Sequence, residues 1–276
     1  ILFSVFYITL ESVQGLISGS LVWENQGVMR LHGAVPIYRH PNSLAGVATG
    51  ALPFVVFLFP KMKSWISRGF LLAVAVTSTS CVLFSGSRTA YLGFFALVVW
   101  WFIISKHKAR FLLVGAVVGV VAFGNVPEEY KERFSSIWDG GEGTSTGTRM
   151  VILEDSWQIL KENPMGVGVS SFTAVRAKKF GRIQDTHNLY FEVATNLGIQ
   201  GLVVFLALVF AMFRTFRSVV LKLESERRAI VKLAKAGRHL PWVRKSYGPM
   251  LEDIDYLIAV AHAAGGFLLV RMVLGL

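Results

Sequence analysis

The sequence contains little charge and almost no cysteine. Charged residues make up 16% of the 276 residues, whereas about a quarter is usual in soluble domains. The single cysteine, Cys81, excludes an internal disulfide. The loop 127–195, which is expected to face outward, lacks an HExxH motif, paired cysteines and a DxD motif. No P-loop or dinucleotide fingerprint is present in the chain. We therefore expect no metal site and no cofactor.

Apolar sequence is what the chain has in abundance. Hydrophobic residues account for 53% of it, and they gather in runs of about 15–20, the length that crosses a bilayer as a helix. A soluble bundle would show polar faces with a 3.6-residue period, and most of these runs have none. The sequence therefore predicts an all-α, polytopic transmembrane helix bundle. Its predicted spans are 1–18, 43–60, 67–86, 88–104, 110–126, 196–213 and 256–276.

We treat residues 1–276 as one membrane domain. The first residue, Ile1, already lies in an apolar segment, and no signal peptide is visible. We expect further residues upstream, including more helices.

Positive charge is concentrated between the apolar runs. The net charge of +11 would fit a nucleic-acid-binding protein, but the basic residues cluster in three connectors, 61–68, 106–110 and 214–255. An even number of predicted helices separates these connectors, so all lie on one side, and positive loops stay in the cytoplasm. The outer, periplasmic face then receives 19–42, the corner 85–88 and the loop 127–195. We expect membrane lipids, and no nucleic acid, as partners.

Segments outside the spans also have helical patterns. Residues 218–236 predict a basic amphipathic helix, which either rests on anionic lipid at the cytoplasmic surface or binds a partner. In the periplasmic loop, a helix ended by Pro164 and Gly166 has one stripe, formed by Ile152, Leu153, Ser156, Trp157 and Leu160. Further on, Asp185 or Thr186 is placed to cap a helix that His187 opens.

Basic side chains on the outer face need an explanation. Arg88 either snorkels to the membrane surface or belongs to a site. Its small neighbours, Ser87 among them, favour a site, since they let a ligand approach backbone N–H groups at a helix N-terminus that attracts anions. Arg149 at a helix start opposes the helix dipole, so we expect a partner for it, either an acidic side chain such as Asp155 or a phosphate. Arg39 either contacts lipid headgroups or belongs to the same site.

His187 is open to two interpretations. It is either a helix-start residue without chemistry or a general base at the membrane edge. The neighbouring carboxylate of Asp185 would keep the ring basic, and Tyr190 lies one turn further on the same face. Together with the arginines, a base there suits a substrate with a negatively charged group anchored in the membrane, such as a lipid-linked pyrophosphate whose glycan projects outward.

Several motifs occur in a recognisable order. HPNSLAG precedes one span and SGSRTAYLGF begins another. GTR and a helix with Trp157 follow, then NPMGVGVSSF and HNLYFEVATNLGIQGL. Each is weak alone, but the ordered set resembles the O-antigen ligase and polymerase superfamily over roughly residues 36–213.

This resemblance implies a multi-pass glycosyltransferase of the GT-C type in the bacterial inner membrane, without a metal. Such proteins take a glycan from undecaprenyl pyrophosphate on the periplasmic side. Ligases pass it to a lipid A core sugar in lipopolysaccharide biosynthesis, polymerases to another lipid-linked repeat, and relatives to protein hydroxyls. By resemblance, Arg88 and Arg149 hold the pyrophosphate, and His187 deprotonates the acceptor hydroxyl for inverting attack. The further candidate substrate-binding residues are Arg39, Ser87, Asn188 and Tyr190.

Alternative functions remain open at this point. A repeat-unit polymerase shares the same residues and differs only in its acceptor. A transporter of lipid-linked glycans would place polar groups through the depth of the bundle, whereas here they gather on one face, apart from Glu11 and the run Thr77–Ser80. In the last span, Arg271 and His262 match no motif; Arg271 either snorkels or helps the outer site.

Overall fold

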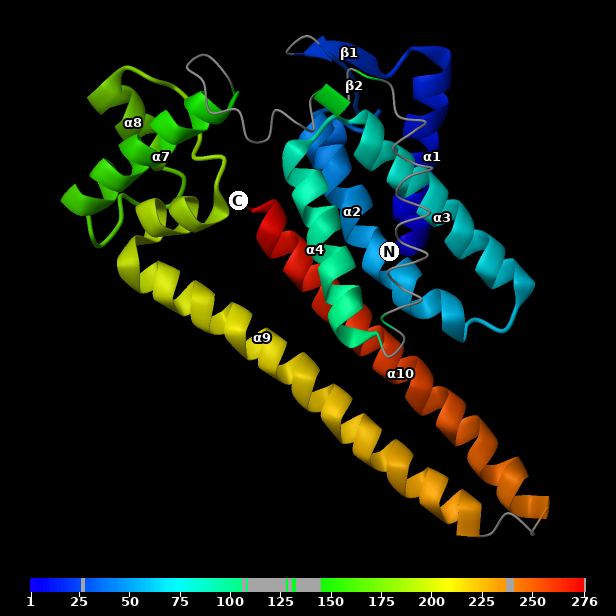
Figure 1. Cartoon of the computed structure of the whole chain (residues 1–276). Helices are drawn as coiled ribbons and strands as arrows, with labels where there is room; N and C mark the ends of the chain where they lie inside the picture. The colour runs from blue at the N-terminus through cyan, green and yellow to red at the C-terminus, as the bar shows by residue number, and fades with distance from the viewer. Residues whose placement is uncertain are drawn as a thin grey trace.

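The computed structural model describes residues 1–25, 28–105, 108, 128, 131–132, 145–236 and 241–275. These residues confirm the predicted all-α membrane fold (Figure 1). The helices are α1 (Leu2–Ser18), α2 (Pro41–Leu58), α3 (Trp65–Phe84), α4 (Arg88–Ile104), α7 (Ser145–Glu162), α8 (Phe172–Phe180), α9 (Leu189–Ala236) and α10 (Pro241–Leu274). The predicted span 110–126 lies outside the described residues.

Four of the described helices are long and apolar enough to cross a membrane, so the protein is a multi-pass membrane protein. They are α2 with its 3-10 extension to Lys61, α3, α9 and α10. Helices α1 and α4 are apolar but have 17 residues each, a length of about 26 Å against a hydrocarbon core of about 30 Å.

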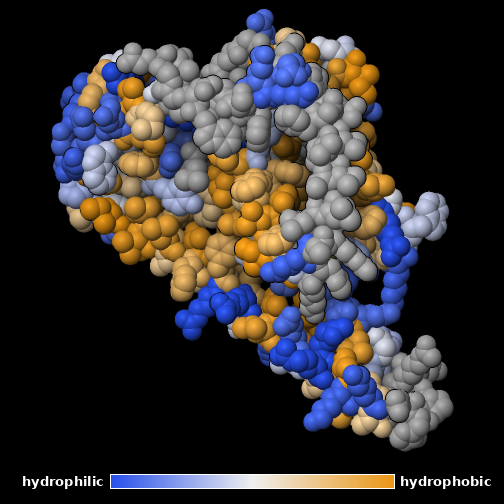
Figure 2. Space-filling view, in the orientation of Figure 1, coloured by the Kyte–Doolittle hydropathy of each residue, from blue (hydrophilic) through white to orange (hydrophobic). Residues whose placement is uncertain are grey.

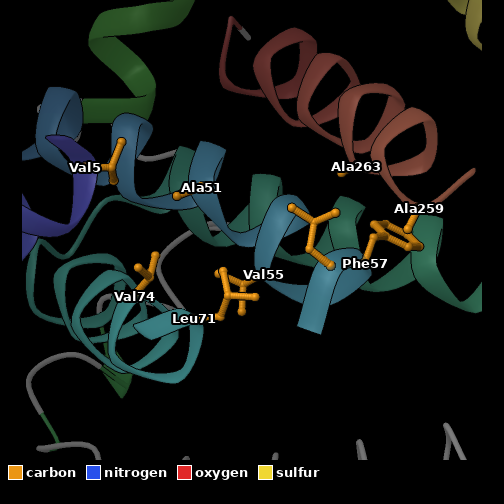
Figure 3. Close-up of a cluster of buried hydrophobic side chains, with 9 residues drawn as sticks. Val5, Ala51, Val55, Phe57, Leu71, Val74, Ala259 and Ala263 are labelled. Atoms are coloured by element: carbon orange, nitrogen blue, oxygen red, sulfur yellow. The ribbon is translucent and has the colours of Figure 1, made fainter. Parts of the chain in front are cut away.

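Helix α2 lies at the centre of the bundle and packs against α3, α10, α4 and α1 (Figure 1). Its sequence explains this position, because small residues let neighbouring helices approach closely. A Cβ at Gly50 would stand 3.2 Å from the Phe267 ring of α10. Figure 3 shows the cluster that results, in which Val55 of α2 faces Leu71 and Val74 of α3.

A hydroxyl pair joins α1 to α3 inside the bundle. Thr9 Oγ1 and Thr77 Oγ1 are 2.8 Å apart, so one hydroxyl donates to the other, which donates its own proton to a carbonyl of its helix. Thr77 belongs to the polar run that a transporter would need in its pathway. Its hydroxyl is instead used for helix packing, as is common between membrane helices.

A β-hairpin covers the outer end of α1. Strand β1 (Val22–Asn25) pairs antiparallel with β2 (Val28–Leu31). These strands were not predicted, because four residues are too few for a period-2 pattern to be recognised. Val28 and Leu31 are buried, which fixes the hairpin onto the bundle.

The helices α9 and α10 form a long antiparallel hairpin (Figure 1). Helix α9 is interrupted at Gly198, and its continuous part, residues 199–236, has a length of about 57 Å, well beyond the thickness of a bilayer. Residues 218–236 therefore continue the spanning helix, and the separate surface helix predicted there is not formed. In Figure 2 the first part of α9 is covered by apolar residues, while polar residues gather toward the far end of the hairpin.

Two of the predicted basic connectors lie together at the inner end. Lys61 and Arg227 both pair with Asp255, at 3.7 and 2.6 Å, and Lys63 pairs with Glu252. This confirms that 61–68 and 214–255 share a side. The third connector, 106–110, lies outside the described residues except for Lys108.

Candidate functional site

A cavity of about 770 Å³ opens among α1, α2, α4, α7, α10 and the start of α9. Its outer part is polar and is lined by Asn42, Ser43, Ser87, Thr89, Arg149, His187 and Arg271. One to three helical turns deeper the lining becomes apolar, with Val47, Ala51, Phe54 and Phe267. The cavity therefore offers cationic and hydrogen-bonding groups at one end and a hydrocarbon surface at the other.

The corner 85–88 is a tight turn between α3 and α4 that satisfies its own polar groups. Gly86 adopts φ 58°, a left-handed conformation that favours glycine. Ser87 caps α4 by accepting the N–H of Ala90 at 3.3 Å, and the Ser85 hydroxyl accepts the N–H of Ser87. Arg88 is consequently the first residue of α4, which is its predicted position.

Arg30, which is not among the predicted site residues, fixes this corner from the β-hairpin. The side chain is only 4% exposed. Its Nε donates to Ser85 O and its Nη2 to Asn42 Oδ1, each at 2.7 Å. One guanidinium thus joins β2, the corner and the first turn of α2. An arginine between apolar residues in VMRL was the signal, but without the strand it cannot be read as buried.

Arg149 reaches the cavity from α7. Its Nη1 donates to Thr89 Oγ1 at 3.3 Å, so α7 is bonded to the first turn of α4. Burial and then the nearby charge of Arg88 lower the pKa of Arg149 from its ordinary value, although a guanidinium stays charged in proteins. Two like charges held close together create a local potential that favours a polyanion. Arg88 itself is half-buried beside the cavity; the flanking Ser87 and Thr89 line it.

The carboxylate of Asp155 pairs with arginines other than Arg149. It pairs with Arg176 at 2.9 Å and with Arg182 at 3.1 Å, and the side chains of Asp155 and Arg176 are almost fully buried. Asp155 is therefore not the partner of Arg149, which corrects one of the two expectations for that arginine.

The buried face of α7 is also shifted from the predicted stripe. Ile152, Ser156 and Leu160 are buried as expected, but Trp157 is 50% exposed and lies beside the Lys161 ammonium. The charged side chain of Asp155, instead of Trp157, lies on the buried side of α7. The apolar pattern was misleading because an ion pair, rather than a hydrophobic stripe alone, holds α7 to α8.

Replacing Asp155 with asparagine is expected to lower the free energy of unfolding by about 3 kcal/mol, because two guanidinium groups lose their buried counter-charge. Thermal unfolding of the purified protein measures this. Glu154→Gln is the matched control, since Glu154 is exposed and makes no ion pair within the described parts of α7 and α8. Equal stability of the two variants would contradict a structural role for the pair.

The NPMGVGVSSF motif docks onto a break in α9 at Gly198 (φ 76°, ψ −178°). The break frees backbone groups that the motif then binds. Val167 N donates to Thr195 O at 2.9 Å, Gly168 N to Asn196 O at 3.0 Å, and Ile199 N to Pro164 O at 2.9 Å.

Asn196 holds the other end of the same motif. Its buried Oδ1 accepts the N–H groups of Ser171 and Phe172, both at 3.1 Å. It therefore caps α8 from a neighbouring helix. The break and the cap together fix α7 and α8 to the start of α9, the part of the chain that carries His187.

His187 precedes α9 instead of opening it. The helix begins at Leu189, and Asn188 Oδ1 caps it by accepting the N–H groups of Tyr190 and Phe191 at 3.0 and 3.1 Å. The predicted caps, Asp185 and Thr186, are wrong because their side chains bond within the turn before the helix. His187 has φ 49°, a strained left-handed conformation, and its exposed ring lines the cavity.

The carboxylate of Asp185 does not pair with His187 within the described residues; it accepts the N–H of Thr186 at 2.8 Å. His40 is the other histidine nearby. Burial, then the charges of Arg30 and of His187, lower the pKa of His40. Its Nδ1 accepts the N–H of Asn42 at 3.2 Å, which places the proton of the neutral ring on Nε2.

The remaining predicted residues have other positions. The Tyr190 hydroxyl donates to Met272 O at 3.1 Å and so joins α9 to α10, and Asn188 is a helix cap. Arg39 is exposed beside the cavity without lining it. Direct substrate contact by these three stays a prediction. No group of three or more His, Cys, Asp or Glu side chains that would hold a metal ion occurs among the residues that the structure describes.

Comparison with known proteins places the central part of the chain in a family. No curated protein matches the sequence. Residues 72–206 match the family model of O-antigen ligase. This range contains the corner with Arg88, all of α7 and α8, and the turn with His187; Asn42, Ser43 and Arg271, which also line the polar part of the cavity, lie outside it. The match over residues 72–206 supports membership of the chain in the O-antigen ligase superfamily.

Proposed function

We propose that the protein transfers a glycan from undecaprenyl pyrophosphate to an acceptor hydroxyl at the periplasmic face of a bacterial inner membrane. The observation that supports this most is the two-part cavity. Its apolar depth suits a lipid chain, and its outer end has Arg149 and His187, from segments far apart in sequence. The family match covers both residues.

In the proposed reaction the acceptor oxygen attacks the anomeric carbon as the bond to the pyrophosphate oxygen breaks, inverting that carbon. The acceptor proton passes to His187, whose exposed ring can return it to water. The electron pair of the broken bond stays on the leaving pyrophosphate. Arg88 and Arg149, whose charges are close enough to affect one another, stabilise that charge.

The acceptor defines the alternatives. A lipid A core sugar makes the protein a ligase, a second lipid-linked glycan makes it a repeat-unit polymerase, and a protein hydroxyl makes it a protein glycosyltransferase. Purified protein given a labelled lipid-linked donor and each acceptor in turn separates these cases. We expect transfer in EDTA, since the proposed reaction uses only side chains; lack of transfer to every acceptor would contradict the proposal.

Arg149→Gln is expected to raise the KM for the donor by about tenfold, the effect of one lost charge-assisted hydrogen bond. Arg149→Lys keeps the charge but not the two-pronged geometry, so we expect an intermediate KM. Initial rates over a range of donor concentrations measure both. An unchanged donor KM in Arg149→Gln would remove this residue from the proposed site.

A further inference from the structure

One cationic side chain in the cavity has no role in the reaction proposed above. Arg271 belongs to the last turn of α10 and lines the cavity. Its guanidinium lies against α2, because a Cβ added at Gly46 would stand 3.6 Å from Nη1. That distance is an ordinary van der Waals contact, so the guanidinium lies directly beside the α2 backbone at this position. Arg271 thus points toward the α2 wall of the cavity.

The end of α10 does not need this guanidinium for its own stability. The carbonyl of Met272 accepts the Tyr190 hydroxyl, and that of Gly275 accepts the N–H of Leu189 at 2.6 Å. Arg271 is an exposed residue, and within the described residues its guanidinium makes no hydrogen bond or ion pair. A cation that lines a cavity without a counter-charge is suited to an anionic ligand.

The position of Arg271 along α10 indicates which part of a ligand it would meet. Phe267, one turn deeper, belongs to the apolar lining, and Gly275, one turn further out, lies beside the start of α9. Arg271 is therefore at the boundary between the apolar and polar parts of the cavity. Arg149 enters the polar part from α7 and is bonded to Thr89.

We propose that Arg271 is a positioning residue that binds the phosphate attached directly to the lipid chain, while Arg149 binds the phosphate next to the sugar. The inference rests on the proposed function, because it assigns the two phosphates of the same donor. It makes the two arginines separable: a lipid with one phosphate needs Arg271 and has no group for Arg149.

Binding of undecaprenyl phosphate tests this without any transfer reaction. The probe is added to the purified protein, and its dissociation constant is obtained from the ligand-dependent rise in unfolding temperature. We expect Arg271→Gln to weaken binding about tenfold, the scale of one charge-assisted hydrogen bond. Arg149→Gln should change it less than about twofold, as should Lys178→Gln, which removes an exposed cation of α8.

Controls keep the outcome decisive. Undecaprenol, which lacks the phosphate, should bind wild type and Arg271→Gln equally. If Arg271→Gln does not fold, Arg271→Lys replaces it, with an expected loss of about threefold because the charge remains. Unchanged binding of undecaprenyl phosphate, or an equal loss in Lys178→Gln, overturns the inference. Absence of glycan transfer with the binding pattern intact contradicts the proposed function alone.

Discussion

His187→Ala is expected to lower the rate of glycan transfer by about 10²–10⁴-fold, the usual contribution of a general base. His187 lines the polar end of the cavity with an exposed ring, so removing the ring opens no hole in a packed core. Donor binding should therefore stay close to that of wild type. Initial rates at saturating donor, together with the unfolding temperature, measure the two effects separately.

The left-handed backbone at His187 requires its own control. Asparagine tolerates positive φ better than most residues but has no basic ring. His187→Asn should thus fold as well as wild type and be as inactive as His187→Ala. If His187→Asn retained transfer, the residue would matter through its backbone, and the base would have to be sought elsewhere.

Gly198→Ala is expected to have the largest effect on folding. A Cβ at this position would stand 2.4 Å from the carbonyl carbon of Met165 and 2.6 Å from Pro164 O, and both are backbone atoms that cannot rotate away. Added to the cost of a left-handed alanine, the clash should lower the free energy of unfolding by more than about 2 kcal/mol. It should also separate the NPMGVGVSSF motif from α9, which limited proteolysis detects between α7 and α9.

Gly181→Ala is the control that distinguishes the cost of a positive φ from the cost of the steric clash at Gly198. Gly181 ends α8 with φ 68°, and a Cβ there meets nothing within 4 Å. This variant therefore bears only the conformational cost, about 1 kcal/mol. If the two alanine variants were equally stable, the close approach of the motif to α9 would not contribute to stability.

The sequence was sufficient for the membrane fold because lipid imposes one strong rule, a helix wherever a long apolar run occurs. It also placed the connectors 61–68 and 214–255 on one side from charge alone. Hydropathy could not reveal that 214–236 continues the spanning helix. A basic segment is compatible with either a surface helix or an extension into water, and packing against α10 selects the second.

The sequence predicted residues that line the candidate site, but not the residues that hold the surrounding segments in place. Arg149 and His187 were identified as polar residues on a common face, and the structure brings both to one cavity. Arg30 and Asn196 were missed, because each bonds across more than ten positions of the chain. Arg271 was left between snorkelling and the site, since one sequence does not show which side of α10 faces α2.

The contact between Leu189 N and Gly275 O has a consequence for the chemistry. This hydrogen bond connects the outer end of α9 to the outer end of α10, and the chain itself joins their inner ends. The two helices are therefore connected at both ends, and His187 and Arg271 lie close in sequence to the residues that form the outer connection. Separating these side chains would break the hydrogen bond between Leu189 and Gly275, so a base at His187 and a phosphate-binding group at Arg271 would be aligned during folding and need little rearrangement in each turnover.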